Sequence, residues 1–168
     1  MYYDEVDSPL GTITLIGDQT NLFSLFYGTF IENQMDVINW CQKHGLPTDM
    51  TQSSNHFTSA IHQLDEYFQG KRQTFSISYQ LFGTTFQKKV WHALIKNVPF
   101  GDIWSYKDLA EQVGSPKAVR AIGGAMNKNP ISIIVPCHRV IGTSGKLVGY
   151  GSGVDKKQYL LQLEKGKS

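Results

Sequence analysis

The sequence has few cysteines and no long apolar run. Its two cysteines, Cys41 and Cys137, lie far apart in a chain of 168 residues, so a disulfide framework is not expected. No apolar stretch reaches the length of a membrane-spanning helix. The acidic start, Met1 to Glu5, lacks the basic-then-apolar order of a signal peptide. These absences favour an intracellular, cytoplasmic protein with no membrane partner.

The rest of the composition is that of a folded chain. Hydrophobic residues make up 40% of the sequence, charged residues 18% and aromatic residues 12%. This content can build a core and is too apolar for a disordered chain. The length fits one domain of ordinary size or two small ones.

Charge is divided unevenly along the chain, although the formal net charge is only +2. Residues 1–80 hold three Lys or Arg against nine Asp or Glu, and residues 81–168 hold 13 against five. This asymmetry indicates a polyanionic partner for the second half, or it is a drift of composition without meaning. Since the charge balance changes sign near residue 81, we expect two domains, 1–80 and 81–168.

The first half predicts a small α/β domain with a short antiparallel sheet. Apolar residues alternate over 10–16 and again over 21–27, which predicts a hairpin or meander. Helical spacing over 57–68 predicts a helix that ends at Gly70. Alternation over 74–79 predicts a further strand, and no residue in this half suggests chemistry.

The second half predicts mainly helices, the first over 86–95. Ser105 to Asp108 then has the order of a capping box ahead of a short helix. The next helix is expected to begin at Ser115-Pro116, with Ser as its N-cap and Pro in its first turn. Two short helices joined by a tight turn are typical of a helix-turn-helix, and also of a plain packing unit.

The second of these helices is rich in small residues and contains Gly123-Gly124. Each glycine in a helix interior lowers its stability by about 1 kcal/mol relative to alanine. Small side chains let another backbone approach closely, and both a sugar-phosphate strand and a neighbouring helix fit this pattern. Arg120 is a long cationic side chain that stands among these small residues.

The apolar run 131–135 predicts a short buried strand that leads to Pro136-Cys137-His138-Arg139. A lone cysteine is usually an inert buried residue. A cationic or proton-accepting neighbour makes it nucleophilic. Because adjacent residues of an extended chain point to opposite faces, contact between Cys137 and His138 requires a turn of the backbone or a bridging water.

The motif Pro136-Cys137-His138-Arg139 resembles the acceptor motif of the O6-alkylguanine-DNA alkyltransferases, the methylated-DNA–protein-cysteine methyltransferases. In the first half, Asp7 to Gly11 is similar to the start of many members. The other matching residues are Phe86-Gln87, Ser105-Tyr106, Arg120 to Met126, Asn129-Pro130, Ser144-Gly145, Gly149-Tyr150, Leu160-Leu161 and Glu164.

We therefore expect an α+β fold, in which the small N-terminal domain is followed by a mainly helical C-terminal domain with a helix-turn-helix. The resemblance implies direct DNA repair by irreversible, single-turnover transfer of a methyl or larger alkyl group from O6-alkylguanine. O4-alkylthymine stays open as a second substrate. The implied partner is double-stranded DNA containing the lesion, bound by a monomer without a cofactor.

The resemblance also implies roles for single residues. Cys137 takes the alkyl group, and His138 accepts its proton through a bridging water while Glu164 orients the imidazole. Tyr106 donates a proton toward the leaving guanine. Arg120 fills the gap that the flipped nucleotide leaves in the duplex.

Further residues are implied in DNA binding and in the substrate pocket. Asn129 holds the turn before the active-site strand. The residues implied in DNA binding are Lys117, Ala118, Gly123 and Gly124, and those implied in the pocket are Val140, Tyr150, Gly151 and Ser152. Members of the family commonly have glycine at the position of Ser152. The serine side chain is therefore expected to narrow the substrate pocket of this protein.

Some members hold zinc in the N-terminal domain, but here we expect no metal. The cysteine and histidines of the first half lack the spacing of zinc ligands; they are Cys41, His44, His56 and His62.

Three other classes fit the sequence less well. Alkyltransferase-like proteins have Trp in place of the nucleophile, whereas this chain has Cys137. Adaptive-response regulators carry an additional cysteine-rich metal domain that is not found here. A cysteine hydrolase needs an oxyanion hole, for which the sequence offers no independent support.

Overall fold

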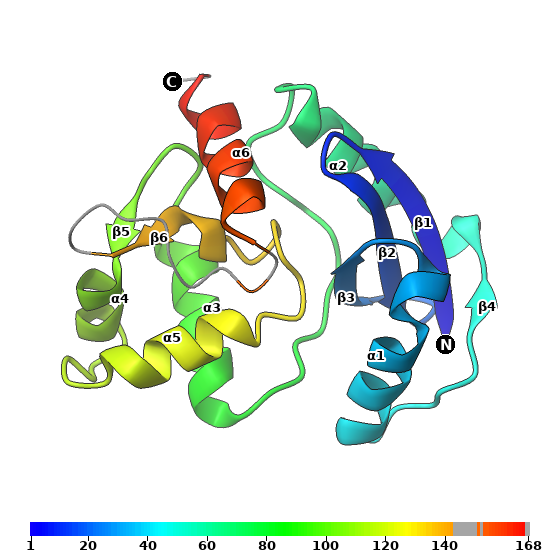
Figure 1. The fold of residues 1–168 in the computed structure, drawn as a ribbon, viewed down its shortest axis with the longest axis horizontal. Helices are drawn as coiled ribbons and strands as arrows, with labels where there is room; N and C mark the ends of the chain where they lie inside the picture. Colours follow the sequence, from blue (N-terminus) through cyan, green and yellow to red (C-terminus); the bar gives the residue numbers. More distant parts are fainter. Residues whose placement is uncertain (143–150, 152, 167–168) are drawn as a thin grey trace. The chain divides into compact units, whose positions relative to one another are not determined.

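The computed structural model describes residues 1–142, 151 and 153–166 (Figure 1). The chain divides into two compact units, Met1–Phe82 and Gly83–Ser168. Among the described residues, no helix combines the length and apolar character needed to cross a bilayer.

The N-terminal unit is built on a four-stranded sheet in the order β3-β2-β1-β4. Its strands are β1 (Tyr2–Ser8), β2 (Gly11–Gly17), β3 (Leu22–Tyr27) and β4 (Thr51–Gln52). The first three are antiparallel neighbours, so the predicted hairpin is confirmed, and β4 runs parallel to β1. The strand predicted over 74–79 is wrong. This segment touches the sheet through a single bridge between Leu22 and Tyr79.

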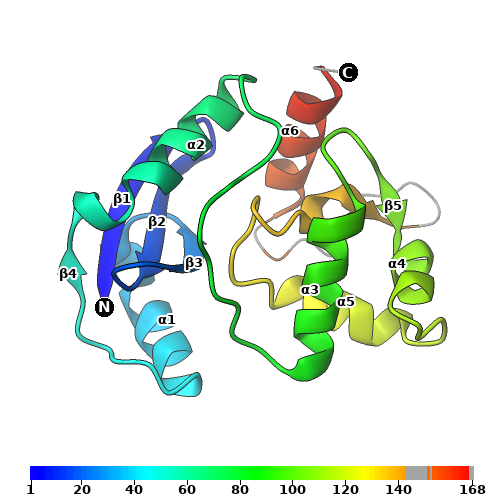
Figure 2. The same ribbon diagram turned by 180° about the vertical axis from the view of Figure 1, so that it is seen from behind.

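Two helices cover this sheet, α1 (Phe30–Lys43) and α2 (Thr58–Phe68), on its opposite faces (Figures 1 and 2). The prediction of α2 is confirmed, and Gly70 just beyond it has a φ of 75°, a conformation that glycine adopts without strain. The sequence did not lead us to predict α1. Its buried Val37 and Cys41 pack against Ile16 of β2, so Cys41 is a core residue.

The described residues of the C-terminal unit form four α-helices, a 3₁₀ helix and a short two-stranded parallel sheet. In chain order these elements are α3 (Thr85–Asn97), β5 (Trp104–Ser105), α4 (Tyr106–Gln112), α5 (Val119–Asn127), β6 (Val140–Ile141) and α6 (Val154–Lys165). The buried indole of Trp91 in α3 donates a hydrogen bond to the carbonyl of Ala125 at 2.9 Å, which fixes α3 against α5. The predicted α+β class is confirmed.

The helix-turn-helix pair is α4 and α5, and its first half forms as predicted. Ser105 caps α4, and the capping box with Asp108 is complete. The N-cap predicted at Ser115 is wrong, because α5 begins at Val119 with Ala118 as its N-cap. Residues 115–118 form a turn, in which the amide of Ala118 donates to the carbonyl of Ser115 at 2.9 Å.

The strand predicted over 131–135 is also wrong. These residues are buried, but the chain folds back on itself, and the amide of Val135 donates to the carbonyl of Ile131 at 2.9 Å. Ile133 has a φ of 78°, a conformation that costs a β-branched residue about 1–3 kcal/mol. This turn delivers Pro136 to the 3₁₀ helix Cys137–Arg139.

Candidate active site

Cys137 lies on a turn of the backbone and not in an extended strand. The 3₁₀ helix Cys137–Arg139 is buried, and the side chain of Asn129 contacts the sulfur. Asn129 Nδ2 donates to Cys137 Sγ at 2.9 Å and to the carbonyl of Val135 at 2.9 Å. Its Oδ1 accepts from the amide of Ile131 at 3.0 Å. One amide therefore spans the turn and touches the thiol, and sequence reasoning had missed the contact with sulfur.

His138 and Glu164 form a buried pair. His138 Nε2 lies 2.6 Å from Glu164 Oε2, and both side chains are almost completely buried. Arg139 donates to both oxygens of the same carboxylate, from Nε at 2.8 Å and from Nη2 at 3.0 Å. Glu164 therefore lies between an imidazole and a guanidinium, and its hydrogen bonds fix the orientation of both groups.

The other nitrogen of His138 has no hydrogen-bond partner among the described residues. Nδ1 is buried and makes no hydrogen bond within the described part of the chain. A buried polar atom of this kind is normally satisfied by a water molecule or a substrate group. The imidazole therefore has one nitrogen bound to a carboxylate and one free to exchange a proton.

The pKa values in this cluster are set mainly by burial. Burial raises the pKa of the Cys137 thiol to about 12, against the hydrogen bond from Asn129 and the charge of Lys157, which lower it. Burial lowers the pKa of His138 below its ordinary value. Burial by itself would raise the pKa of Glu164. The hydrogen bonds and charges of His138 and Arg139 outweigh burial and hold the pKa of Glu164 well below the usual range. The resting site is thus a neutral thiol, a neutral imidazole and a carboxylate.

Tyr106 reaches this cluster from the helix-turn-helix. Strands β5 and β6 pair Ser105 with Ile141, and Tyr106 follows directly as the first residue of α4. Burial, together with the charge of Cys137, raises the pKa of the Tyr106 phenol. Tyr106 therefore keeps its proton and lies within electrostatic reach of the sulfur.

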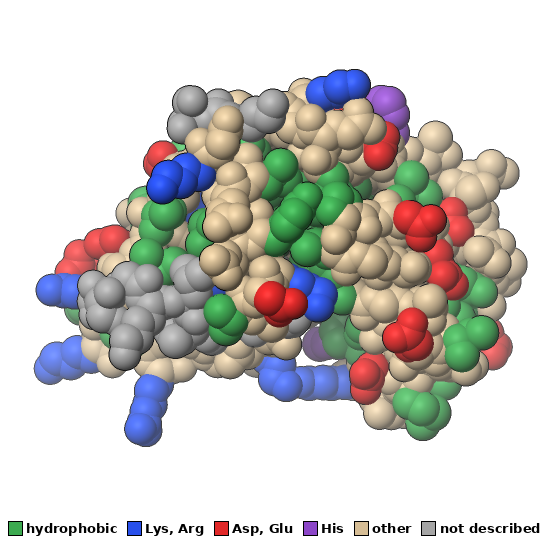
Figure 3. Space-filling model, turned by 45° about the horizontal axis from the view of Figure 1, so that its top comes forward, with side chains coloured by type: hydrophobic (Ala, Val, Ile, Leu, Met, Phe, Trp, Pro, Cys, Tyr) green, Lys and Arg blue, Asp and Glu red, His purple; other side chains and the backbone are tan. Residues whose placement is uncertain are grey.

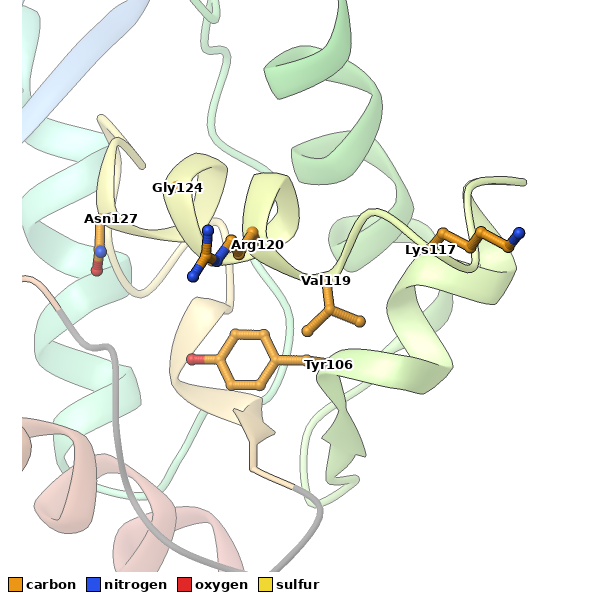
Figure 4. Close-up of a pocket in the computed structure, with 7 residues that line it drawn as sticks. Tyr106, Lys117, Val119, Arg120, Gly124 and Asn127 are labelled. Carbon is orange, nitrogen blue, oxygen red and sulfur yellow. The ribbon is translucent and has the colours of Figure 1, made fainter.

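A groove of about 600 Å³ opens beside Tyr106 along α5 (Figure 4). Its lining residues are Tyr106, Lys117, Val119, Arg120, Gly123, Gly124 and Asn127. Figure 4 shows the side chains of Tyr106 and Arg120 facing the same space, with Lys117 pointing away from them. The predicted residues Tyr106, Arg120, Gly123 and Gly124 are thus brought together.

The two glycines of α5 face open space. A Cβ atom built on Gly123 or Gly124 meets no heavy atom within 4 Å. Close packing on a neighbouring helix therefore does not explain them within the described residues. The surface they leave can accept another backbone.

The predicted residues outside α4 and α5 come from different parts of the C-terminal unit. Lys117 and Ala118 lie in the turn before α5 and not in the helix. Val140 is buried and pairs with Trp104. Gly151 lies against the end of α5, where an added Cβ would come within 3.3 Å of the Asn127 carbonyl.

Two predicted pocket residues, Tyr150 and Ser152, lie outside the described residues. Within the described residues, no group of three or more His, Cys, Asp or Glu side chains is placed to hold a metal ion.

Lys157 is a buried charged residue that sequence reasoning missed. It is 1% exposed, and its Nζ donates to the carbonyl of Val140 at 2.5 Å. Lys157 shares the buried face of α6 with Leu160 and Glu164, at helical spacing. That spacing was the available signal, since it places a lysine on the same face as a residue already assigned to the site.

Surface charge differs between the units. On the face drawn in Figure 3, acidic side chains gather over the N-terminal unit, and Lys and Arg side chains project from the C-terminal unit. On this face, the uneven division of charge along the sequence is also visible on the folded surface.

Fold and site together define an α+β protein with a sheet unit and a helix-turn-helix unit, the latter holding a buried Cys-Asn contact beside a His-Glu-Arg cluster. Residues 1–81 match the family described as "6-O-methylguanine DNA methyltransferase, ribonuclease-like domain". Residues 85–166 match "6-O-methylguanine DNA methyltransferase, DNA binding domain". The chain belongs to the methylated-DNA–protein-cysteine methyltransferase family, as its motifs predicted.

Curated relatives match over nearly the whole chain. The methylated-DNA–protein-cysteine methyltransferase of Methanosarcina barkeri is 43% identical over 164 residues, which cover 98% of this chain and 97% of the relative. That of Mycobacterium tuberculosis is 42% identical over 168 residues, which cover 100% of this chain and 94% of the relative.

Solved structures have the same fold. A crystal structure of the Mycobacterium tuberculosis O6-methylguanine methyltransferase has a TM-score of 0.84 at 41% identity, covering 99% of this chain and 94% of that one. The Mycobacterium tuberculosis OGT in complex with DNA has a TM-score of 0.85 at 41% identity, covering 100% of this chain and 95% of that one. The methyltransferase of Pyrococcus kodakaraensis has a TM-score of 0.76 at 28% identity, covering 96% and 98%.

Proposed function

We propose that this protein repairs duplex DNA by moving the alkyl group of O6-alkylguanine onto Cys137, once per molecule. The arrangement around Cys137 carries this proposal: a thiol held by Asn129, next to a His138-Glu164 pair and within electrostatic reach of Tyr106. The names of the relatives and the DNA complex of the Mycobacterium tuberculosis protein support it.

The chemical step is a displacement at carbon. The sulfur of Cys137 forms a bond to the alkyl carbon, the bond from that carbon to guanine O6 breaks, and its electron pair passes into the guanine ring. The Tyr106 phenol is protonated at rest because its pKa is raised. It gives its proton to the ring as this charge develops and regains the proton that the thiol releases, so no net charge remains on Tyr106. The products are a thioether and an unmodified guanine.

The thiol must lose its proton before or during this step, because a thiolate is the nucleophile. His138 Nδ1 takes that proton through a water molecule, since this nitrogen is buried and has no hydrogen-bond partner in the described chain. Glu164 on the opposite nitrogen stabilises the imidazolium that forms, and Arg139 keeps the carboxylate ionised. This relay follows the logic of a triad applied to a thiol.

The damaged base must leave the duplex to meet a buried sulfur, at a cost of a few kcal/mol. Arg120 stands exposed on α5 and faces the same groove as Tyr106, so it can enter the stack in place of the extruded nucleotide. The open surface at Gly123 and Gly124 lets α5 approach the sugar-phosphate backbone within the minor groove.

The protein is consumed by its own reaction and acts as a monomer. Water does not displace the sulfur from the alkyl carbon of a thioether, because a thiolate is a poor leaving group there, so Cys137 is not regenerated. All the residues assigned to the reaction come from one unit of one chain, and no second copy is needed to complete the site.

The test is the mass of the peptide that contains Cys137 after incubation with duplex DNA carrying O6-methylguanine. We expect the added mass of one CH₂ group on Cys137, with one methyl per chain, and none in Cys137→Ser. Cys41→Ser is the matched control, because Cys41 is also buried but lies in the core of the other unit. The assignment would be overturned if the methyl group were found on Cys41, or if the Cys137→Ser variant were methylated at another residue.

A further inference from the structure

Asn127 lines the groove beside Tyr106, but the mechanism above gives it no role. It is the last residue of α5, and its side chain is exposed. Figure 4 shows this side chain leaving the helix on the same side as Arg120, and both residues line the groove of about 600 Å³. The mechanism therefore uses the cation at one end of this helix face and leaves the amide at the other end unexplained.

The two polar side chains stand on one face of α5. Arg120, Gly123, Gly124 and Asn127 follow the i, i+3, i+4, i+7 spacing of a single helical face. The rise of an α-helix places Asn127 about 10 Å from Arg120 along the axis. A Cβ atom on either glycine between them would meet no heavy atom within 4 Å. A DNA strand can therefore come close to the middle of this face, so the longer side chains at its two ends reach past the strand to the bases.

The backbone that carries Asn127 is anchored on both sides. Before it, the carbonyl of Ala125 accepts from the buried indole of Trp91 at 2.9 Å. After it, the side chain of Asn129 donates to the carbonyl of Val135 at 2.9 Å, in the turn before the active-site cysteine. A side chain on such a backbone keeps its distance from the site, and selective hydrogen bonding to a base requires this rigidity.

A carboxamide recognises other groups than a cation does. Lys128 is also exposed, but it lies about 100° around the helix from Asn127, where it flanks the face and suits a phosphate. A carboxamide both donates and accepts, whereas lysine only donates. In the minor groove an A·T pair presents acceptors alone, and a G·C pair adds the 2-amino donor of guanine. The Asn127 amide can therefore bond to both N3 and the 2-amino group of guanine, but only to an acceptor of an A·T pair.

We propose that Asn127 determines a sequence preference: its carboxamide reads the minor-groove edge of a base pair about three steps from the flipped nucleotide and favours G·C there. The position follows from the separation of about 10 Å between Asn127 and Arg120, since successive bases of a strand are about 3.4 Å apart. The inference rests on the proposed function, in which Arg120 takes the place of the flipped base. It makes the rate of repair depend on the sequence that surrounds the lesion.

The test is the single-turnover rate of methyl transfer, at protein concentrations below saturation, from duplexes that contain one O6-methylguanine. The base pair at each nearby position on either side is changed in turn between G·C, C·G, A·T and T·A. Base analogues then isolate the 2-amino group, because inosine lacks it and 2,6-diaminopurine adds it to a pair with thymine. Asn127→Ala removes the amide at an exposed helical position that alanine suits, so this variant should fold. Lys128→Ala is the matched control at the neighbouring position.

We expect guanine at one position to speed transfer about tenfold over an A·T pair. Inosine should lose this advantage, and 2,6-diaminopurine should gain it. Asn127→Ala should act on all duplexes at the rate of the A·T duplex, whereas Lys128→Ala should slow all of them equally and keep the preference. Duplex stability alone acts in the opposite direction, since stronger pairing opposes flipping.

Equal rates with every neighbouring pair would overturn the proposal, and so would a preference that persists in Asn127→Ala. Uniform slowing in Asn127→Ala, with no preference in the unaltered protein, would also overturn it, because a phosphate contact behaves in this way. Binding of Cys137→Ser to the same duplexes should show the same preference without methyl transfer. Preferential binding without transfer in the unaltered protein would count against the proposed function, and binding without preference would count against the role of Asn127.

Discussion

Asn129 donates one hydrogen bond to Cys137 Sγ at 2.9 Å and another, from the same nitrogen, to the carbonyl of Val135 at 2.9 Å. The carbonyl oxygen of the same side chain accepts from the amide of Ile131 at 3.0 Å. A single amide therefore fixes the turn and the sulfur that the turn presents. Local structure and reactivity depend on the same side chain.

This relationship predicts a large effect of Asn129→Asp. A carboxylate can still accept from Ile131, but it cannot donate to the sulfur and its charge opposes a thiolate. We expect methyl transfer to slow by about 100-fold, corresponding to roughly 3 kcal/mol for a lost hydrogen bond to a charged group. The rate is measured in a single turnover with duplex DNA carrying O6-methylguanine.

Asn97→Asp is the control for that experiment. Asn97 is also a partly buried amide of the C-terminal unit, and it donates to the carbonyl of Ala93 at 2.9 Å in α3. Its replacement should leave the rate nearly unchanged. Equal rates for the two variants would show that the contact with sulfur has no part in the reaction.

The buried imidazole of His138 makes stability depend on pH. Its pKa in the folded chain lies below the ordinary value of 6.5, because burial disfavours the charged ring. In the unfolded chain the imidazole has its ordinary pKa of 6.5. As the pH falls through 6.5, the unfolded chain binds a proton that the folded chain does not, so the free energy of unfolding decreases. Glu164 acts in the same direction at lower pH, since its folded pKa is also lowered.

We therefore expect the urea midpoint to fall between about pH 7.5 and about pH 5.5. Each pH unit between the folded and unfolded pKa values of His138 contributes about 1.4 kcal/mol. His138→Gln should flatten this fall, whereas replacement of the exposed His92 by Gln should not. If the urea midpoint of His138→Gln fell by the same amount over this pH range, the pH dependence of stability would come from other groups.

Much of the fold could be predicted because its signals are local. The hairpin of β2 and β3, the helix α2 and the capping box at Ser105 each depend on residues that are close in the sequence. The errors occurred where tertiary contacts decide the conformation. The segment 131–135 is as apolar as a strand, but Asn129 holds it as a turn with Ile133 at positive φ.

The sequence predicted which residues form the candidate site better than it predicted the contacts between them. The motif at Cys137 identified the sulfur and its histidine, and the structure adds which groups surround them. Contacts between Asn129 and Cys137, or between Lys157 and Val140, join segments that are eight and 17 residues apart. The periodic spacing of residues in the sequence does not predict contacts between such separate segments, so these contacts could only be found in the folded chain.

Arg120 is expected to matter for duplex DNA and little for a base that is already unstacked. It is exposed and lines the groove beside Tyr106. We expect Arg120→Ala to slow methyl transfer from duplex DNA by at least about tenfold, because unstacking costs a few kcal/mol that the side chain offsets. Transfer from a single-stranded oligonucleotide should change much less.

The matched control is Lys88→Ala, which removes an exposed cation from α3 of the same unit. It should affect both substrates slightly and equally. If Arg120→Ala slowed both substrates to the same extent, its role would be general attraction to DNA and not replacement of the flipped base.

Gly124→Ala should separate folding from DNA binding. Its Cβ would meet no heavy atom within 4 Å, so alanine should stabilise α5, by roughly 0.5–1 kcal/mol, while the added methyl group obstructs an approaching backbone. We expect a higher urea midpoint together with weaker binding to duplex DNA. Gly83→Ala is the contrasting control: its Cβ would lie 2.6 Å from the Trp91 ring, so the protein should lose stability. Unchanged DNA affinity in Gly124→Ala would mean that no backbone lies against this face of α5 in the complex.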